Sequence, residues 1–71
     1  MAEEVRAEMV ANVIRVEVAE GQTVTAQTTL IVLESMKMEI PVHPETGGTV
    51  TRVAVQEGDV VQEGDLLVVL A

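Results

Sequence analysis

The chain lacks most of the side chains from which small domains build cross-links or stacking surfaces. Its 71 residues contain no cysteine, phenylalanine, tyrosine or tryptophan, and a single histidine, His43. Without cysteine neither a disulfide framework nor a thiolate metal site is available, and one histidine cannot form a zinc site alone. A chain of this length is close to the smallest that holds a core without such cross-links, so its stability must come from packing.

Positively charged side chains are also scarce. Four Lys and Arg stand against 12 Asp and Glu, which gives a formal net charge of −8. The chain therefore has neither a basic face for phosphates nor an aromatic platform for bases, which excludes nucleic acid as a partner, and its charge disfavours an anionic membrane surface. No apolar run is long enough to span a membrane, and the start, Met1-Ala2-Glu3-Glu4, is acidic where a signal peptide is basic. We expect a cytoplasmic protein.

The sequence repeats itself at an offset of 37 residues. Residues 13–34 align with residues 50–71, and ten of the 22 aligned positions are identical. Each copy has the pattern of a strand, a glycine-containing turn, a very short strand, a second turn and an apolar strand. The first copy has Gln27-Thr28 where the second has Gly64-Asp65, which predicts that the turn there is either less favourable or of a different type. Two copies are too few for a solenoid and indicate a closed body with twofold pseudosymmetry.

The valine-rich composition, together with the absence of a helical period, predicts an all-β fold. Residues 3–9 and 38–42 alternate apolar and polar side chains, and adding them to the two copies gives about eight short strands. Two four-stranded sheets packed face to face fit this pattern, in a single domain over residues 1–71.

The only lysine, Lys37, lies between two methionines in the run Glu34-Ser35-Met36-Lys37-Met38-Glu39-Ile40-Pro41. The predicted strands 30–35 and 38–42 leave only Met36-Lys37 as their connecting loop. Two-residue hairpin loops favour residues that accept positive φ angles, such as Asn and Gly, and Met and Lys are poor choices. A local rule broken without a gain in folding points to a functional constraint. We therefore predict an exposed Lys37 hairpin, with Met36 the more exposed methionine and Met38 partly in the core.

The repeat also predicts where this hairpin lies. A shift of Lys37 by 37 residues in either direction falls just outside the chain, so the counterpart of the hairpin is the region of the two termini. In a twofold body, the hairpin should then project from the end opposite the termini.

The sequence shows no set of residues for catalysis. Ser35 is the only serine, His43 has the context of an ordinary connection residue, and the carboxylates of residues 57–65 belong to turns without the spacing of a calcium-binding loop. A lysine amine has a reference pKa of about 10.4 and is protonated at neutral pH, so a separate enzyme must deprotonate it before it reacts. We expect a protein with neither catalytic residues nor a metal site.

The segment Glu34-Ser35-Met36-Lys37-Met38-Glu39 resembles the biotin-attachment motif of biotinyl domains, the carrier modules of biotin-dependent carboxylases. The paired Gly-Asp turns and valines are similar as well, and the likeness covers roughly residues 9–71. The chain most resembles the small free-standing biotin/lipoyl attachment proteins, although Ser35 replaces an Ala that often precedes the Met. The resemblance implies a flattened β-sandwich, or barrel-sandwich hybrid, of two quasi-symmetric four-stranded sheets with the lysine on an exposed hairpin.

The resemblance also implies a function. Biotin protein ligase would join biotin to Lys37, a biotin carboxylase would load the biotin with a carboxyl group, and a carboxyltransferase would pass that group to an acceptor, commonly an acyl-CoA. The domain itself would be a non-catalytic monomer that tethers biotin within reach of both enzymes. Recognition by the ligase and the partners would use the flanking residues Glu34, Ser35, Met36, Met38 and Glu39.

Two other functions remain open. A lipoyl carrier domain shares the fold and the hairpin lysine, but usually has Asp before and Ala after that lysine, where this chain has Met36 and Met38. An unmodified interaction module would instead use the Met36-Lys37-Met38 hairpin to dock a partner. The mass of protein made together with the ligase, combined with streptavidin binding, distinguishes the three functions.

Overall fold

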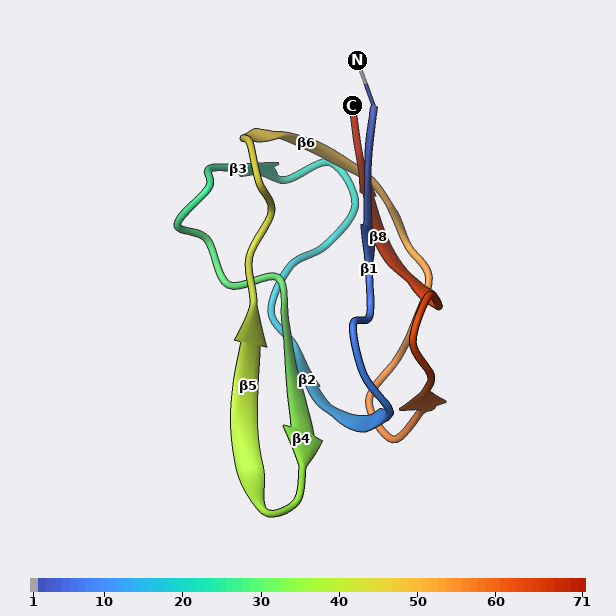
Figure 1. Cartoon of the computed structure of the whole chain (residues 1–71). Helices are drawn as coiled ribbons and strands as arrows, with labels where there is room; N and C mark the ends of the chain where they lie inside the picture. Colours follow the sequence, from blue (N-terminus) through green and yellow to red (C-terminus); the bar gives the residue numbers. More distant parts are fainter. Residues whose placement is uncertain (1) are drawn as a thin grey trace.

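The computed structural model describes residues 2–71, which form an all-β fold without helices (Figure 1). Every strand contains valine, leucine or isoleucine, because β-branched and aliphatic side chains pack well on a pleated, half-buried surface. The eight strands in chain order are β1 (Glu3–Arg6), β2 (Ala11–Val16), β3 (Thr23–Val24), β4 (Ile31–Ser35), β5 (Met38–Val42), β6 (Gly48–Val53), β7 (Val60–Val61) and β8 (Leu66–Leu70).

The strands form two antiparallel four-stranded sheets, with the orders β1-β8-β6-β3 and β5-β4-β2-β7. Each sheet takes strands from both copies of the repeat, because the short strands β3 and β7 each join the sheet of the other copy. One hydrophobic core contains buried residues of both sheets, as in a β-sandwich. The predicted fold, a sandwich of two quasi-symmetric four-stranded sheets, is confirmed.

The strand registers carry the 37-residue offset of the sequence through the whole body. Val13 pairs with Leu33 in one sheet, and Val50 pairs with Leu70 in the other. Both ladders then shift register at the next residue of β2 and β6. The Val13 carbonyl accepts a hydrogen bond from the Gly58 N–H (2.8 Å), and the Val50 carbonyl accepts the equivalent bond at 2.7 Å. The sequence repeat therefore corresponds to a structural twofold, which includes the matching register shifts in β2 and β6.

Matched aliphatic side chains fill the space between the sheets. Leu33 and its counterpart Leu70 are 2% and 0% exposed, and burial of such a side chain contributes about 1.5–3 kcal/mol. Among residues 2–71 no buried side chain is polar or charged. The buried hydrophobic residues are Val5, Ala7, Ala11, Val13, Val18, Val24, Leu30, Ile31, Val32, Leu33, Val50, Val61, Leu67, Val68 and Leu70.

The turns differ between the two copies where the sequence indicated. Gly64 has a φ of +91°, whereas Gln27 at the equivalent position does not have a positive φ. The Thr28 hydroxyl accepts a hydrogen bond from the Thr25 N–H (3.0 Å), where a carboxylate oxygen of Asp65 accepts the equivalent bond at 2.8 Å. The first copy therefore keeps the turn with a different backbone type and without the negative charge.

A backbone hydrogen-bond donor beside the second copy's turn is missing beside the first copy's turn, and the His43 side chain replaces it. In the second copy's turn, the Ala7 N–H donates to the Asp65 carbonyl (2.9 Å). The equivalent of Ala7 is Pro44, which has no N–H. Instead, the His43 Nδ1–H donates to the Thr28 carbonyl, the equivalent acceptor, at 3.1 Å. This bond gives His43 a role in the connection between the two copies.

The first strand is shorter than the sequence indicated. We predicted a strand over residues 3–9, and β1 ends at Arg6. The reason is that Ala7 bonds to the turn beside it: its N–H donates to the Asp65 carbonyl (2.9 Å) and its carbonyl accepts from the Gly64 N–H (2.8 Å). The chain then bends at residues 8 and 9, so the alternation of side chains continues beyond the strand.

The β4–β5 hairpin and the chain termini lie at opposite ends of the molecule (Figure 1). The body is elongated, with extents of 32 × 19 × 18 Å, and Glu3 pairs with Leu70, so the two terminal strands run side by side. The location predicted for the Lys37 hairpin from the repeat is confirmed. None of the elements described over residues 2–71 is a helix able to cross a membrane.

Candidate functional site

The hairpin between β4 and β5 carries Lys37 at its tip. The two strands pair without interruption from Ile31 to Ser35 of β4, which begins one residue later than predicted, so only Met36 and Lys37 form the loop. Their φ angles are +53° and +65°, and within residues 2–71 they are the two non-glycine residues with positive φ. This left-handed conformation costs a non-glycine residue about 1–2 kcal/mol. The spacing correctly predicted a primed turn made by unsuitable residues.

The amine of Lys37 is free to react with another molecule. Its side chain is exposed, and no other side chain in the described part of the chain forms a hydrogen bond or ion pair with it. The nearby carboxylate of Glu39 instead faces Arg15, whose Nη2 lies 3.7 Å from it. An unpaired amine on a flexible four-carbon stem can enter the active site of another protein.

The two methionines beside Lys37 are both largely exposed. Met36 is 93% exposed and Met38 is 63% exposed, so the predicted order is correct. Met38 lies on the same side of β5 as Ile40, which packs against the core, but it is beyond the end of that core. We expected Met38 to lie partly in the core, and this expectation is wrong for most of the side chain, because most of its surface is exposed. Exposed methionines adapt to a partner surface because their side chains are unbranched and polarizable.

Like charges face each other on the outer side of the hairpin. Glu34 pairs directly with Glu39 across the two strands, an arrangement that destabilises a sheet. The exposed ion pair of Glu39 with Arg15 offsets little of this repulsion. Half-buried Ser35 pairs with Met38 at the base of the loop. The structure thus places all six predicted residues in one hairpin. Forming this hairpin costs more free energy than forming one with a favourable turn and no like charges facing each other.

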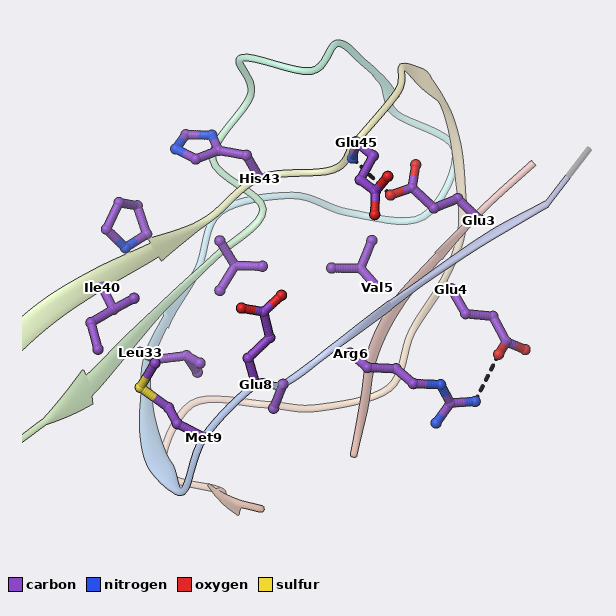
Figure 2. A pocket seen from close by; sticks show the side chains of 13 residues that line it. Glu3, Glu4, Val5, Arg6, Glu8, Met9, Leu33, Ile40, His43 and Glu45 are labelled. Carbon is purple, nitrogen blue, oxygen red and sulfur yellow. Dashed lines mark hydrogen bonds and ion pairs between the residues drawn. The ribbon is translucent and has the colours of Figure 1, made fainter. Parts of the chain in front are cut away.

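A groove separate from the hairpin tip lies between the edge strands β1 and β5 (Figure 2). Its apolar wall includes Val5 of β1 together with Leu33 and Ile40, and Lys37 is not among its lining residues. This groove could not be predicted from the sequence, because it depends on these two edge strands facing each other in the folded protein. Its full lining is Glu3, Glu4, Val5, Arg6, Ala7, Glu8, Met9, Leu33, Ile40, Pro41, Val42, His43 and Glu45.

The charged groups at the groove serve the fold. The Glu3 carboxylate accepts hydrogen bonds from the Glu45 N–H (2.8 Å) and from the N–H and hydroxyl of Thr46 (3.2 and 3.1 Å). These bonds, the one from Glu45 first, hold the pKa of the Glu3 carboxyl below its ordinary value. Arg6 forms an exposed ion pair with Glu4 at 2.7 Å (Figure 2). The described residues include no group of three side chains able to hold a metal ion.

A free lysine on a strained hairpin, at the end of a quasi-symmetric sandwich away from the termini, is the arrangement of a domain that carries a covalently attached group. Comparison with known proteins agrees with this class. Residues 3–70 match the Biotin_lipoyl family model, described as "Biotin-requiring enzyme". The chain belongs to this family.

Two relatives and one solved structure illustrate the range of the family. The chain is 52% identical to "Biotinylated protein TB7.3 homolog" of Mycobacterium leprae, over the full length of both. It is 44% identical to "Biotin-dependent acyl-coenzyme A carboxylase alpha3 subunit" of the same organism, over 89% of this chain and 10% of that subunit. The crystal structure of the Kluyveromyces lactis urea carboxylase matches with a TM-score of 0.92 and 31% identity, over 100% of this chain and 6% of that one.

Proposed function

We propose that this chain is a biotin carrier domain, spanning residues 1–71, in which Lys37 bears the biotin. The observation that supports this proposal most directly is the unpaired Lys37 amine at the strained tip of the hairpin, in a member of a family described as biotin-requiring. The site fits the group, because the amine is exposed and its neighbour Met36 is 93% exposed, so an acyl group can be added without displacing the core.

Attachment forms an amide bond at Lys37. The lysine nitrogen attacks the carboxyl carbon of a biotinyl-adenylate held by a biotin protein ligase, the bond from that carbon to AMP breaks, and two protons leave the former ammonium group. The ligase supplies the deprotonation. The positive charge at the tip is lost, so the carrier becomes one charge unit more negative.

The carrier's own task is to hold the arm. Bound biotin supplies a ureido nitrogen that takes up a carboxyl group and gives it up again. The rigid sandwich keeps the attachment point at the end away from the termini, and tethering raises the local concentration of the cofactor at each partner enzyme. We assign the catalysis to a biotin carboxylase and a carboxyltransferase, because similar sequence and structure occur in proteins described as carboxylases. The domain acts as a cytoplasmic monomer without catalytic residues of its own.

The residues beside Lys37 form the recognition surface for these enzymes. Met36 and Met38 offer exposed apolar contacts on both sides of the amine. Ser35 forms the base of the loop, and Glu34 and Glu39 add negative charge on the outer side. The folding cost at this hairpin supports the assignment, since local strain persists where function requires it.

Trypsin digestion of protein made with and without the ligase tests the proposal. Because Lys37 is the only lysine, it is also the only trypsin site between Arg15 and Arg52. Biotinylation blocks that site, so peptides 16–37 and 38–52 should be replaced by one peptide, 16–52, that binds streptavidin and has the mass of the biotin adduct.

Lys37→Arg is the matched control. It keeps the charge and the trypsin site but cannot form the amide, so it should fold normally and carry no biotin. Biotin on the Arg variant would contradict the assignment of Lys37. A lipoyl mass at Lys37 would make the domain an acyl carrier, and an unmodified Lys37 after expression with the ligase would overturn the carrier function.

A further inference from the structure

Exposed apolar side chains gather at one end of the molecule. Within residues 2–71, the exposed large hydrophobic residues are Met9, Val10, Met36, Met38 and Val60. Met36 and Met38 belong to the hairpin itself. Met9 and Val10 precede β2 in the β1–β2 connection, which lies at the hairpin end of the body in Figure 1. Val60 pairs with Asn12 of β2, which in turn pairs with Glu34 of β4, so the same end carries all of these side chains.

The internal twofold provides a control within the same molecule. At the opposite end, the residues equivalent to Met9, Val10 and Val60 are, in that order, Thr46, Gly47 and Thr23. These three counterparts are exposed, and the Thr23–Thr49 pair reproduces the Val60–Asn12 pair at the 37-residue offset. The fold therefore accepts polar or small residues at these positions. Val10 and Val60, which are 63% and 66% exposed, therefore contribute little to packing, whereas Met9, at 37% exposed, also packs at the groove. Packing alone does not explain the exposed apolar surface at the Lys37 end.

The other exposed apolar residues lie on two sides of the hairpin, with Val60 on the far edge strand of the same sheet and Met9 on the groove side. Val60, Asn12, Glu34 and Glu39 form one row across the outer face of the sheet, through the registered pairs of β7, β2, β4 and β5. Neighbouring strands are about 4.8 Å apart, so this row spans roughly 14 Å directly behind the tip. On the groove side, Figure 2 shows Met9 extending toward Leu33.

We propose that Met9, Val10 and Val60 extend the hairpin into a docking surface for the ligase that acylates Lys37. The inference rests on the proposed function. Before modification only the short lysine side chain reaches out, so the ligase must approach the hairpin and the surface behind it closely. The later partner enzymes meet a longer arm and can act from farther away. A ligase surface complementary to this region has apolar side chains opposite Met9 and Val60. It has basic side chains opposite Glu34 and Glu39.

The size of a stable contact supports this extension. A specific protein interface covers about 800 Å² on each partner, which is more than the three side chains of the tip supply. The β1–β2 connection and β7 are the neighbouring surfaces at the same end, and they carry the remaining exposed large hydrophobic side chains of residues 2–71. The docking surface is therefore continuous with the site of attachment.

The test measures initial rates of biotinylation of unmodified protein by purified ligase, with ATP and biotin, over a range of carrier concentrations. The variant Met9→Thr/Val60→Thr converts two apolar positions to the threonines of their counterparts. We expect its KM as a substrate to rise roughly tenfold, with kcat within about twofold of wild type, because only binding contacts are lost. Val60→Thr alone, at a position 66% exposed, should raise KM by a smaller factor and leave the thermal midpoint unchanged.

Thr23→Val is the matched control, because it adds the same apolar group at the far end of the body. Its KM should equal that of wild type. An unchanged KM for both threonine variants, with wild type still biotinylated, would overturn the docking surface and leave the carrier function intact. The docking surface is equally overturned if the variants impair only the carboxylation of protein that already carries biotin. Wild type that is not biotinylated at all would overturn both.

Discussion

Replacing Met36 by asparagine is expected to stabilise the protein while slowing the modification of Lys37. Met36 has a φ of +53° in the first position of the two-residue turn. Asparagine accepts this left-handed conformation because its short amide forms local hydrogen bonds, and it is favoured in primed hairpin turns. The Met36 side chain is 93% exposed, so its removal takes away almost no buried apolar surface.

The size of the gain follows from these two facts. A non-glycine residue in the left-handed region loses about 1–2 kcal/mol, and asparagine avoids part of that cost. We expect the free energy of unfolding of Met36→Asn to rise by about 1 kcal/mol, which corresponds to roughly 4–8 °C in Tm for a domain of this size. The exposed thioether beside Lys37 is lost at the same time, so kcat/KM for biotinylation should fall.

Thermal unfolding followed by circular dichroism, together with the ligase assay, measures both effects. Met38→Asn makes the same chemical change on the other side of Lys37, at a strand residue whose φ is not positive. It should give no gain in stability, because asparagine is disfavoured in strands. A Tm for Met36→Asn at or below that of wild type would refute the view that the turn is strained.

Two further predictions concern stability. Leu33→Ala should lower the free energy of unfolding by about 2–5 kcal/mol, because Leu33 is 2% exposed and its removal leaves a cavity between the sheets; urea unfolding should show it, and a loss below about 1 kcal/mol would contradict the tight packing. The Glu3 carboxyl has a pKa lowered from 4.5, so its contribution to stability is present above that value and is lost as the pH falls below it through the folded-state pKa. The urea midpoint of Glu3→Gln should therefore be lower than that of wild type at neutral pH and approach it in acid, whereas a constant difference at all pH values would exclude this linkage.

The sequence was sufficient for the features that depend on local pattern and on the repeat. The valine-rich composition, together with the alternation of apolar and polar residues in residues 3–9 and 38–42, predicted the sheets. The 37-residue offset predicted the twofold body and the location of Lys37 opposite the termini. The strain at Met36-Lys37 was predicted because a two-residue loop leaves few backbone choices.

Other features depend on which strands meet in three dimensions, and the sequence did not reveal them. The alternation of Val5, Ala7 and Met9 continues past the end of β1, where hydrogen bonds to a distant turn stop the strand. Met38 has the apolar character of a core residue but lies beyond the end of the core. The exposure of Val60 could not be read from its valine-rich context, although comparison with Thr23 in the other copy offered a signal.

The side-by-side course of β1 and β8 has a consequence for how this domain can be used in longer polypeptides. Because Glu3 and Leu70 are direct neighbours across two antiparallel strands, the chain enters and leaves the body at almost the same point. A unit with adjoining ends can be inserted into a larger protein, or joined at either end, without stretching its strands. In agreement with this, a segment of similar sequence makes up 10% of an acyl-coenzyme A carboxylase subunit, and a segment of similar structure makes up 6% of a urea carboxylase chain.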